Sequence, residues 1–134
     1  MTKELLAAMA KEAMERAYSP YSGYKVGAAL LCKDGSVSTG CNVENASFSA
    51  TNCAERTAFF KAVSEGKTEF IAIAICGGKD GVIEGLFPPC GVCRQVMREF
   101  CGDDFEIYLL KADRIETYTL GQLLPMSFRP ENIQ

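Results

Sequence analysis

Two short cysteine-containing stretches constrain the fold of this chain more than any other feature. They are Thr51–Arg56, which contains Cys53, and Pro88–Cys93, which contains Cys90 and Cys93. Apolar residues at helical spacing follow each stretch, so each should end a loop and begin a helix. The three thiols are therefore expected at two helix N-termini, where free backbone N–H groups and the helix dipole favour negative charge. Such positions lower the pKa of a cysteine and suit thiolates that bind a metal.

The number and spacing of these ligands favour a catalytic zinc site. Cys90 and Cys93 are spaced i, i+3, so both thiols can face one point from the first turn of a helix. Cys53 would approach that point from the other helix. Three protein ligands leave the fourth tetrahedral position open, which is typical of catalytic rather than structural zinc. Glu55 follows Cys53 by two residues and should point to a different side, which suits a proton carrier rather than a ligand.

The cysteine, histidine and charge counts narrow the chemistry further. The chain has 134 residues, seven cysteines, no histidine and a net charge of −3. An odd number of cysteines, in a chain without an N-terminal signal sequence, predicts reduced thiols in the cytosol. Without histidine, Ser–His and Cys–His mechanisms are excluded, and a proton shuttle must use another residue type. The acidic balance and short apolar runs argue against nucleic-acid and membrane partners.

Periodicity along the chain predicts one α/β domain over residues 1–134. Strands that alternate with helices after residue 50 indicate a layered fold with a mixed sheet of about five strands. The expected elements are a helix over 3–17, hairpin strands Lys25–Cys32 and Ser36–Val43 around Asp34-Gly35, a helix over 53–65 ended by Gly66, a buried strand over 69–76, a glycine-rich loop Gly77–Pro89, a helix over 90–101, strands Phe105–Leu110 and Glu116–Leu120, and a short helix Gly121–Leu124.

The two stretches form one longer motif, Cys53-Ala54-Glu55 followed by Pro89-Cys90-Gly91-Val92-Cys93. This motif closely resembles that of the cytidine deaminase family, in its small form with three zinc cysteines. The similarity extends through Ser19–Ser22, Lys25–Leu30, Asn42–Ser47 and Leu123–Pro125. It implies a three-layer α/β/α cytidine deaminase fold. It also implies hydrolytic deamination of cytidine and 2′-deoxycytidine to uridine and 2′-deoxyuridine, with release of ammonia, in pyrimidine salvage.

The resemblance implies roles for the residues of the metal site. Cys53, Cys90 and Cys93 would hold one Zn²⁺ per subunit. Glu55 would carry a proton from an activated water to ring N3 and then to the leaving amine. The backbone around Ala54 would contact the pyrimidine.

The resemblance also implies residues that bind the nucleoside. Asn42 and Glu44 would hydrogen-bond the ribose hydroxyls. Tyr24 stands where the family usually has Phe near the base, and Phe48 where it often has Tyr. Phe128 matches an aromatic residue that reaches into a neighbouring subunit's site, which implies a homotetramer with shared sites.

A count of charges at the metal suggests a further role for Arg56. Three thiolates on Zn²⁺ leave the centre at −1, so some group must withdraw negative charge from the sulfurs. The two helix N-termini supply part of this effect. We expect Arg56 to supply the rest, through charge-assisted hydrogen bonds to Cys53 or Cys90.

Simpler interpretations of the same residues remain open. Cys90-x-x-Cys93 alone is also typical of a redox pair or half of a structural zinc site. Glu55 also occupies the capping-box position for a helix whose N-cap is Asn52. The rival functions are a deaminase of a cytosine-containing antibiotic such as blasticidin S, and a non-catalytic zinc- or thiol-binding module. The other four cysteines are expected to be small core residues: Cys32, Cys41, Cys76 and Cys101.

Overall fold

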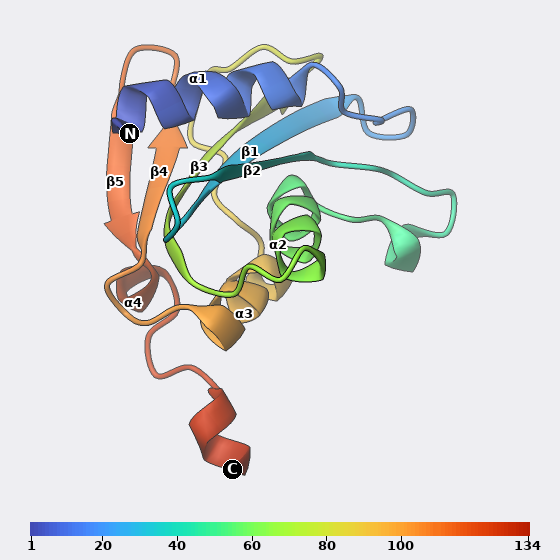
Figure 1. Cartoon of the computed structure of the whole chain (residues 1–134). Coiled ribbons are helices and arrows are strands. Elements are labelled where there is room, and N and C mark those ends of the chain that lie inside the picture. Colours follow the sequence, from blue (N-terminus) through green and yellow to red (C-terminus); the bar gives the residue numbers. More distant parts are fainter.

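The computed structural model describes residues 1–134, in which a five-stranded sheet carries helices on both faces (Figure 1). The strand order is β2-β1-β3-β4-β5, and only β3 and β4 are parallel, so the sheet is mixed as the sequence predicted. The elements are α1 (Lys3–Met14), β1 (Tyr24–Cys32), β2 (Val37–Cys41), a 3₁₀ turn (Phe48–Ala50), α2 (Ala54–Ser64), β3 (Phe70–Lys79), α3 (Gly91–Phe100), β4 (Glu106–Leu110), β5 (Ile115–Thr119), α4 (Leu120–Leu123) and a second 3₁₀ turn (Pro130–Ile133).

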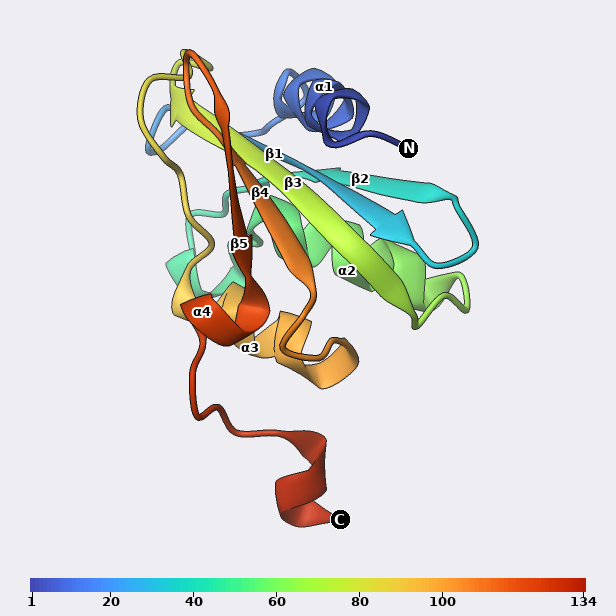
Figure 2. The same ribbon diagram turned by 90° about the vertical axis from the view of Figure 1, so that its left-hand side faces the viewer.

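Two separate apolar clusters, one on each face of the sheet, produce the three layers. Helix α1 packs on β1 and β3 through a cluster that includes Leu6, Ala10 and Met14. Helices α2 and α3 cover the other face, where Phe59 and Met97 belong to the larger cluster. Figure 2 shows the sheet between α1 on one side and α2 and α3 on the other. The predicted α/β/α layering is therefore confirmed. None of the helices is long and apolar enough to cross a lipid bilayer.

Helix α1 begins where the sequence predicted and ends earlier. Thr2 is its N-cap, and the Thr2 side chain accepts a hydrogen bond of 3.1 Å from the Leu5 N–H. The predicted helix extended to residue 17, whereas α1 ends at Met14. The N–H groups of Arg16 and Ala17 bond to carbonyls three residues back, so the last turn tightens into 3₁₀ geometry.

Strand β3 extends further than the sequence predicted. The prediction ended at residue 76 and assigned the following glycines to a loop, but β3 continues to Lys79. Gly77 and Gly78 pair with Val26 and Lys25 of β1. A Cβ atom at Gly78 would lie 1.8 Å from a backbone oxygen of the following loop. These glycines therefore let the loop fold back against a strand, rather than ending that strand.

Helix α2 packs closely on β2, which fixes the position of Cys53 at its N-terminus. A Cβ atom at Gly40 would lie 2.5 Å from the Ala54 carbonyl oxygen and 2.6 Å from the Ala58 nitrogen. Only glycine permits this approach of strand and helix. Ser38 adds a hydrogen bond of 2.7 Å from its hydroxyl to the Ala58 carbonyl. The first turns of α2 are therefore held directly against the sheet.

The remaining predicted elements agree with the structure to within one or two residues. The hairpin between β1 and β2 turns at Asp34-Gly35, where Gly35 has φ +90°. Gly66 has φ +88° just beyond α2, as expected for a glycine at a helix C-terminus. The two 3₁₀ turns were not predicted.

Candidate metal centre and active site

Three cysteine thiols meet at the N-termini of α2 and α3. Cys53 is the N-cap of α2, Cys90 is the N-cap of α3, and Cys93 lies in the first turn of α3. The Cys90 sulfur lies 3.9 Å from that of Cys53 and 3.4 Å from that of Cys93, and all three sulfurs lie within 4.8 Å of one another. A tetrahedral zinc ion with Zn–S bonds of about 2.3 Å would place its sulfurs about 3.8 Å apart. The predicted thiol cluster is therefore present and has dimensions that fit zinc.

The side chains that could hold a metal ion here are three thiols, with no carboxylate and no fourth thiol. Of the other cysteines, Cys32 and Cys76 are buried, as expected for core residues, while Cys41 and Cys101 are half-buried. Burial raises the pKa of Cys76 to about 11 and that of Cys101 to about 12, so both remain protonated, unreactive thiols. This donor set fits the three-ligand arrangement of catalytic zinc.

Arg56 contacts the thiol cluster from the first turn of α2, the helix whose N-cap is Cys53. Its Nη2 donates a hydrogen bond of 3.1 Å to the Cys53 sulfur. Hydrogen bonds from Cys93 and Arg56 lower the pKa of Cys53 from an ordinary value of 9.0 to about 5, although burial acts in the opposite direction. The same bond to Cys53 raises the pKa of Cys93. Arg56 thus favours the thiolate form of Cys53, which is the form that binds a metal.

Glu55 lies beside the thiols but does not cap its helix. Cys53, not Asn52, is the N-cap, and the Asn52 side-chain amide donates to the Thr57 hydroxyl at 3.1 Å. The capping-box interpretation of Glu55 is therefore wrong. The residue is only 4% exposed, and its burial raises the pKa of the carboxyl from 4.5 to about 7. A buried carboxyl that titrates near neutrality can both accept and release a proton.

A cavity of about 320 Å³ opens next to the thiols. Its wall includes Cys53, Glu55 and Cys90, and also Asn42 and Glu44. This volume lies within the range of small-molecule sites, which begins at about 300 Å³. The cavity therefore brings together the predicted metal, proton-transfer and sugar-binding residues.

Asn42 and Glu44 are held in fixed orientations by the backbone around β1. Asn42 accepts from the Val26 N–H and donates to the Tyr24 carbonyl, each at 2.8 Å. Glu44 accepts from the Ser22 N–H at 3.1 Å and from the N–H of the preceding residue at 3.0 Å. Hydrogen bonding by the Ser22 side chain lowers the pKa of Glu44, so its carboxylate stays ionised. Both side chains are thus pre-oriented at the cavity wall.

The structure brings Tyr24 to the cavity and places Phe128 elsewhere. The Tyr24 ring lies against Phe87, with centroids 6.1 Å apart, and the Lys79 ammonium lies 5.4 Å from its centroid. Phe128 is 58% exposed, and its carbonyl accepts a hydrogen bond of 2.9 Å from Gln95. Within one chain, Phe128 is not part of the cavity wall.

Sequence reasoning gave no site role to five residues that line the cavity: Ser22, Val26, Thr51, Phe87 and Pro88. Thr51 immediately precedes the Asn52-Cys53 pair, and Phe87 immediately precedes the Pro88-Pro89 pair. Their position directly before the cysteine motifs is the signal that would have found them. Phe87 contributes an aromatic ring to the cavity wall, next to Tyr24.

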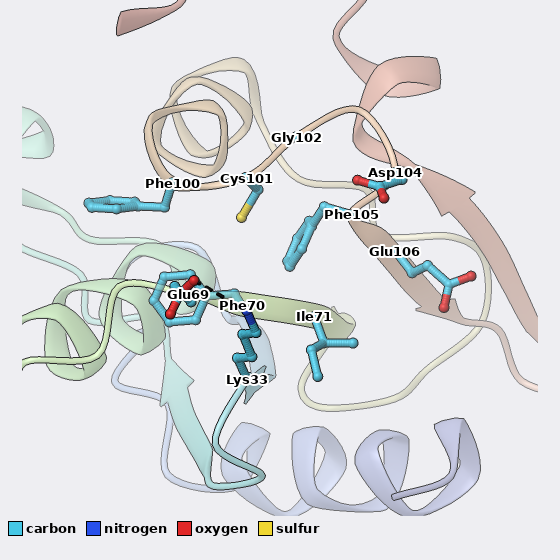
Figure 3. A pocket seen from close by; sticks show the side chains of 10 residues that line it. All are labelled: Lys33, Glu69, Phe70, Ile71, Phe100, Cys101, Gly102, Asp104, Phe105 and Glu106. Carbon is cyan, nitrogen blue, oxygen red and sulfur yellow. Dashed lines mark hydrogen bonds and ion pairs between the residues drawn. The ribbon is translucent and has the colours of Figure 1, made fainter.

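A larger cavity of about 540 Å³ lies near the start of β3 (Figure 3). Aromatic side chains of Phe70, Phe100 and Phe105 line it, and the Lys33–Glu69 ion pair, at 3.4 Å, lies at its edge. None of the thiols of the metal cluster and none of the predicted binding residues reaches it. Cavity size alone therefore does not locate the site.

A three-layer α/β/α fold that brings three thiols and a buried carboxyl to two helix N-termini defines the class of zinc-dependent deaminases. The family model for the cytidine and deoxycytidylate deaminase zinc-binding region matches residues 1–109. The chain belongs to this family.

Relatives and solved structures agree with this assignment. The chain is 50% identical to cytidine deaminases of Sporosarcina psychrophila and Halalkalibacterium halodurans, over 99% of this chain and 96% and 98% of theirs. The crystal structure of cytidine deaminase from Burkholderia pseudomallei is similar with a TM-score of 0.88 and 47% identity, over 96% of this chain and all of that one. The enzyme from Mycobacterium tuberculosis gives a TM-score of 0.81 and 40% identity, over 96% and 98% of the two chains.

Proposed function

We propose that this chain, as a single domain over residues 1–134, hydrolyses cytidine and 2′-deoxycytidine to uridine and 2′-deoxyuridine with release of ammonia. One observation carries the proposal: a single cavity is lined by two thiols of the cluster, Cys53 and Cys90, by Glu55, and by Asn42 with Glu44. That arrangement suits a nucleoside whose base faces the metal and whose sugar faces the two polar residues. The cell would use such an enzyme for pyrimidine salvage in the cytosol, where the seven free thiols stay reduced.

Glu55 carries the proton transfers in this proposal. Bound zinc supplies a water whose pKa is lowered towards about 7. The Glu55 carboxylate accepts a proton from the attacking water and passes it to ring N3 of the pyrimidine. It then takes the second proton from the hydroxyl now bonded to C4 and gives it to the amine, which leaves as ammonia while the C4 carbonyl forms. Its burial and its pKa of about 7 support this role, because the same group must accept a proton and release it. The backbone at Ala54, in the cavity wall, is placed to contact the base.

The charge of the cavity favours a nucleoside over a nucleotide. The residues that line it include Glu44 and Glu55 but no lysine or arginine. A 5′-phosphate close to the Glu44 carboxylate would be repelled. The Lys79 ammonium beside Tyr24 offsets only part of that negative charge. Asn42 and Glu44 offer an amide and a carboxylate to the ribose hydroxyls. The Tyr24 ring, packed on Phe87, supplies an apolar wall near the base.

Arg56 offsets the negative charge of a three-thiolate centre in our proposal. The support is its hydrogen bond to the Cys53 sulfur. The structure records no hydrogen bond between Arg56 and Cys90, the other contact that the sequence allowed. Arg56 thus acts on the ligand that its own helix contributes.

Replacing Glu55 by Gln tests the proposed proton transfer. Glu55→Gln should lower kcat for cytidine by about 10²–10⁴-fold, since general acid–base catalysis is worth that much. Zinc content should stay at one ion per chain, because Glu55 is not a ligand. Ammonia release and metal analysis measure the two quantities, with exposed Glu65→Gln as a control of unchanged activity. Near wild-type turnover in Glu55→Gln, or turnover that survives complete removal of zinc, would contradict the proposal.

Arg56→Gln and Arg56→Ala test the charge argument. Both variants should lose zinc content and turnover, because an unpaired third thiolate makes the site bind the metal less well; a loss of about 10–100-fold in metal affinity is typical when such a partner is removed. Competition with a chelator of known affinity measures the change. Wild-type zinc affinity and turnover in both variants would end this part of the proposal.

We further propose a homotetramer in which neighbouring chains complete each other's sites. The support is the exposed C-terminal segment, which carries Phe128 and a fully exposed Met126. In Figure 1 this segment leaves the body of the molecule on the side of α3. A segment that exposes Phe128 and Met126 in this way suits insertion of these side chains into an adjacent chain.

Mixing two impaired variants tests the sharing of sites. Phe128→Ala chains and Glu55→Gln chains should each be weakly active alone. After unfolding and refolding together they should regain activity, because some sites then combine Glu55 from one chain with Phe128 from another. Light scattering checks for four chains per particle. Mixtures that are no more active than the sum of their parts, or a monomeric particle, would contradict shared sites.

A further inference from the structure

Arg94 of α3 contacts the backbone on both sides of Cys90. Its Nε donates a hydrogen bond of 2.8 Å to the Pro89 carbonyl. Its backbone N–H donates a bond of 3.0 Å to the Cys90 carbonyl. These two carbonyls belong to the peptide groups that flank the Cys90 Cα atom. The helix backbone thus restrains the peptide group after Cys90, and the Arg94 side chain restrains the peptide group before it.

The Pro89 carbonyl depends on a side chain for its hydrogen bond. It precedes the N-cap of α3, so it lies outside the hydrogen-bond ladder of the helix. Pro89 is almost completely buried, and a buried carbonyl without a partner is costly. Arg94 supplies that partner, whereas Cys90 itself is exposed and has little packing to hold it.

The other end of the Arg94 guanidinium is attached to a rigid part of the fold. Its Nη1 donates a hydrogen bond of 2.6 Å to the Leu123 carbonyl. Leu123 ends α4, which is fixed at its start by a capping box between Thr119 and Gln122. The Leu120 N–H also bonds to the carbonyl that precedes β4 at 2.9 Å. Arg94 therefore connects a fixed point of the sheet layer to the loop that carries a thiol.

We propose that Arg94 is a positioning residue for the metal centre, which holds Cys90 in the orientation that zinc requires and so slows release of the ion. The structure records no hydrogen bond between Arg94 and any of the three sulfurs, which separates its action from that of Arg56. The inference rests on the metal-binding part of the proposed function and not on turnover. Removing a partner that orients a metal ligand typically weakens binding by about 10–100-fold.

Gln95 provides a matched control on the same helix. Its side chain donates to the Phe128 carbonyl at 2.9 Å, so it also ties the C-terminal segment to α3. It makes no recorded bond to the backbone around Cys90. If zinc retention depended only on how the C-terminal part of the chain is attached to α3, Gln95→Ala and Arg94→Gln would speed zinc release to a similar extent.

The rate of zinc release tests the inference on the full-length, zinc-loaded protein. Excess chromogenic chelator is added to wild type, Arg94→Gln, Arg94→Lys and Gln95→Ala, and release is followed by absorbance. Arg94→Gln should release zinc about 10–100-fold faster than wild type. Arg94→Lys should fall in between, because a single ammonium group cannot bridge the Pro89 and Leu123 carbonyls as the guanidinium does. Gln95→Ala should match wild type.

Cobalt substitution provides a second measurement that does not depend on turnover. The visible spectrum of Co²⁺ bound to thiolates reports the geometry of the site, so it should change in Arg94→Gln and stay unchanged in Gln95→Ala. If Arg94→Gln fails to fold, Arg94→Lys carries the comparison. Equal release rates and spectra in wild type and both Arg94 variants would overturn the inference, as would equally fast release from Gln95→Ala. A wild-type protein that binds no zinc would overturn the proposed function as well.

Discussion

The site depends on one constraint, the convergence of the N-termini of α2 and α3 at one point beside the sheet. The constraint begins in the packing of α2 on β2, where Gly40 allows the strand to contact the backbone of the helix directly. That contact fixes the position of the α2 N-terminus, and so of Cys53, relative to the sheet. Helix α3 follows the longest strand, and its first turn presents Cys90 and Cys93 towards the same point. The thiol cluster is thus a consequence of how two helices pack, and not of a local loop.

The same convergence governs the electrostatics. Two helix N-termini direct free N–H groups and positive dipole ends towards the sulfurs, which stabilises thiolates. Arg56 adds a full positive charge to Cys53, in a chain that has no histidine to act as a neutral ligand. The carboxyl of Glu55 differs, because its burial disfavours the charged form and raises its pKa. One small region therefore holds the Cys53 sulfur, which favours the charged form, beside a carboxyl whose burial favours the protonated form.

Much of the fold and site could be predicted from the sequence, because periodicity and cysteine spacing are local signals. The thiol cluster and the element order followed from them, and the contact between Arg56 and Cys53 followed from a count of charges. Local sequence patterns did not predict those features that depend on contacts between distant parts of the chain. The sequence is compatible with a capping box between Asn52 and Glu55, but the N-cap of α2 in the structure is Cys53. Arg94 was not identified because its partner Leu123 lies 29 residues away in the chain.

The coordination of zinc in the purified protein is the most direct test of this account. X-ray absorption at the zinc edge distinguishes sulfur from oxygen neighbours and counts each. The account predicts three sulfur ligands at about 2.3 Å and one light atom at the open position. Four sulfur ligands would mean that a further cysteine closes the site and that the centre is structural. A shell of oxygen or nitrogen alone would mean that the thiols do not hold the metal.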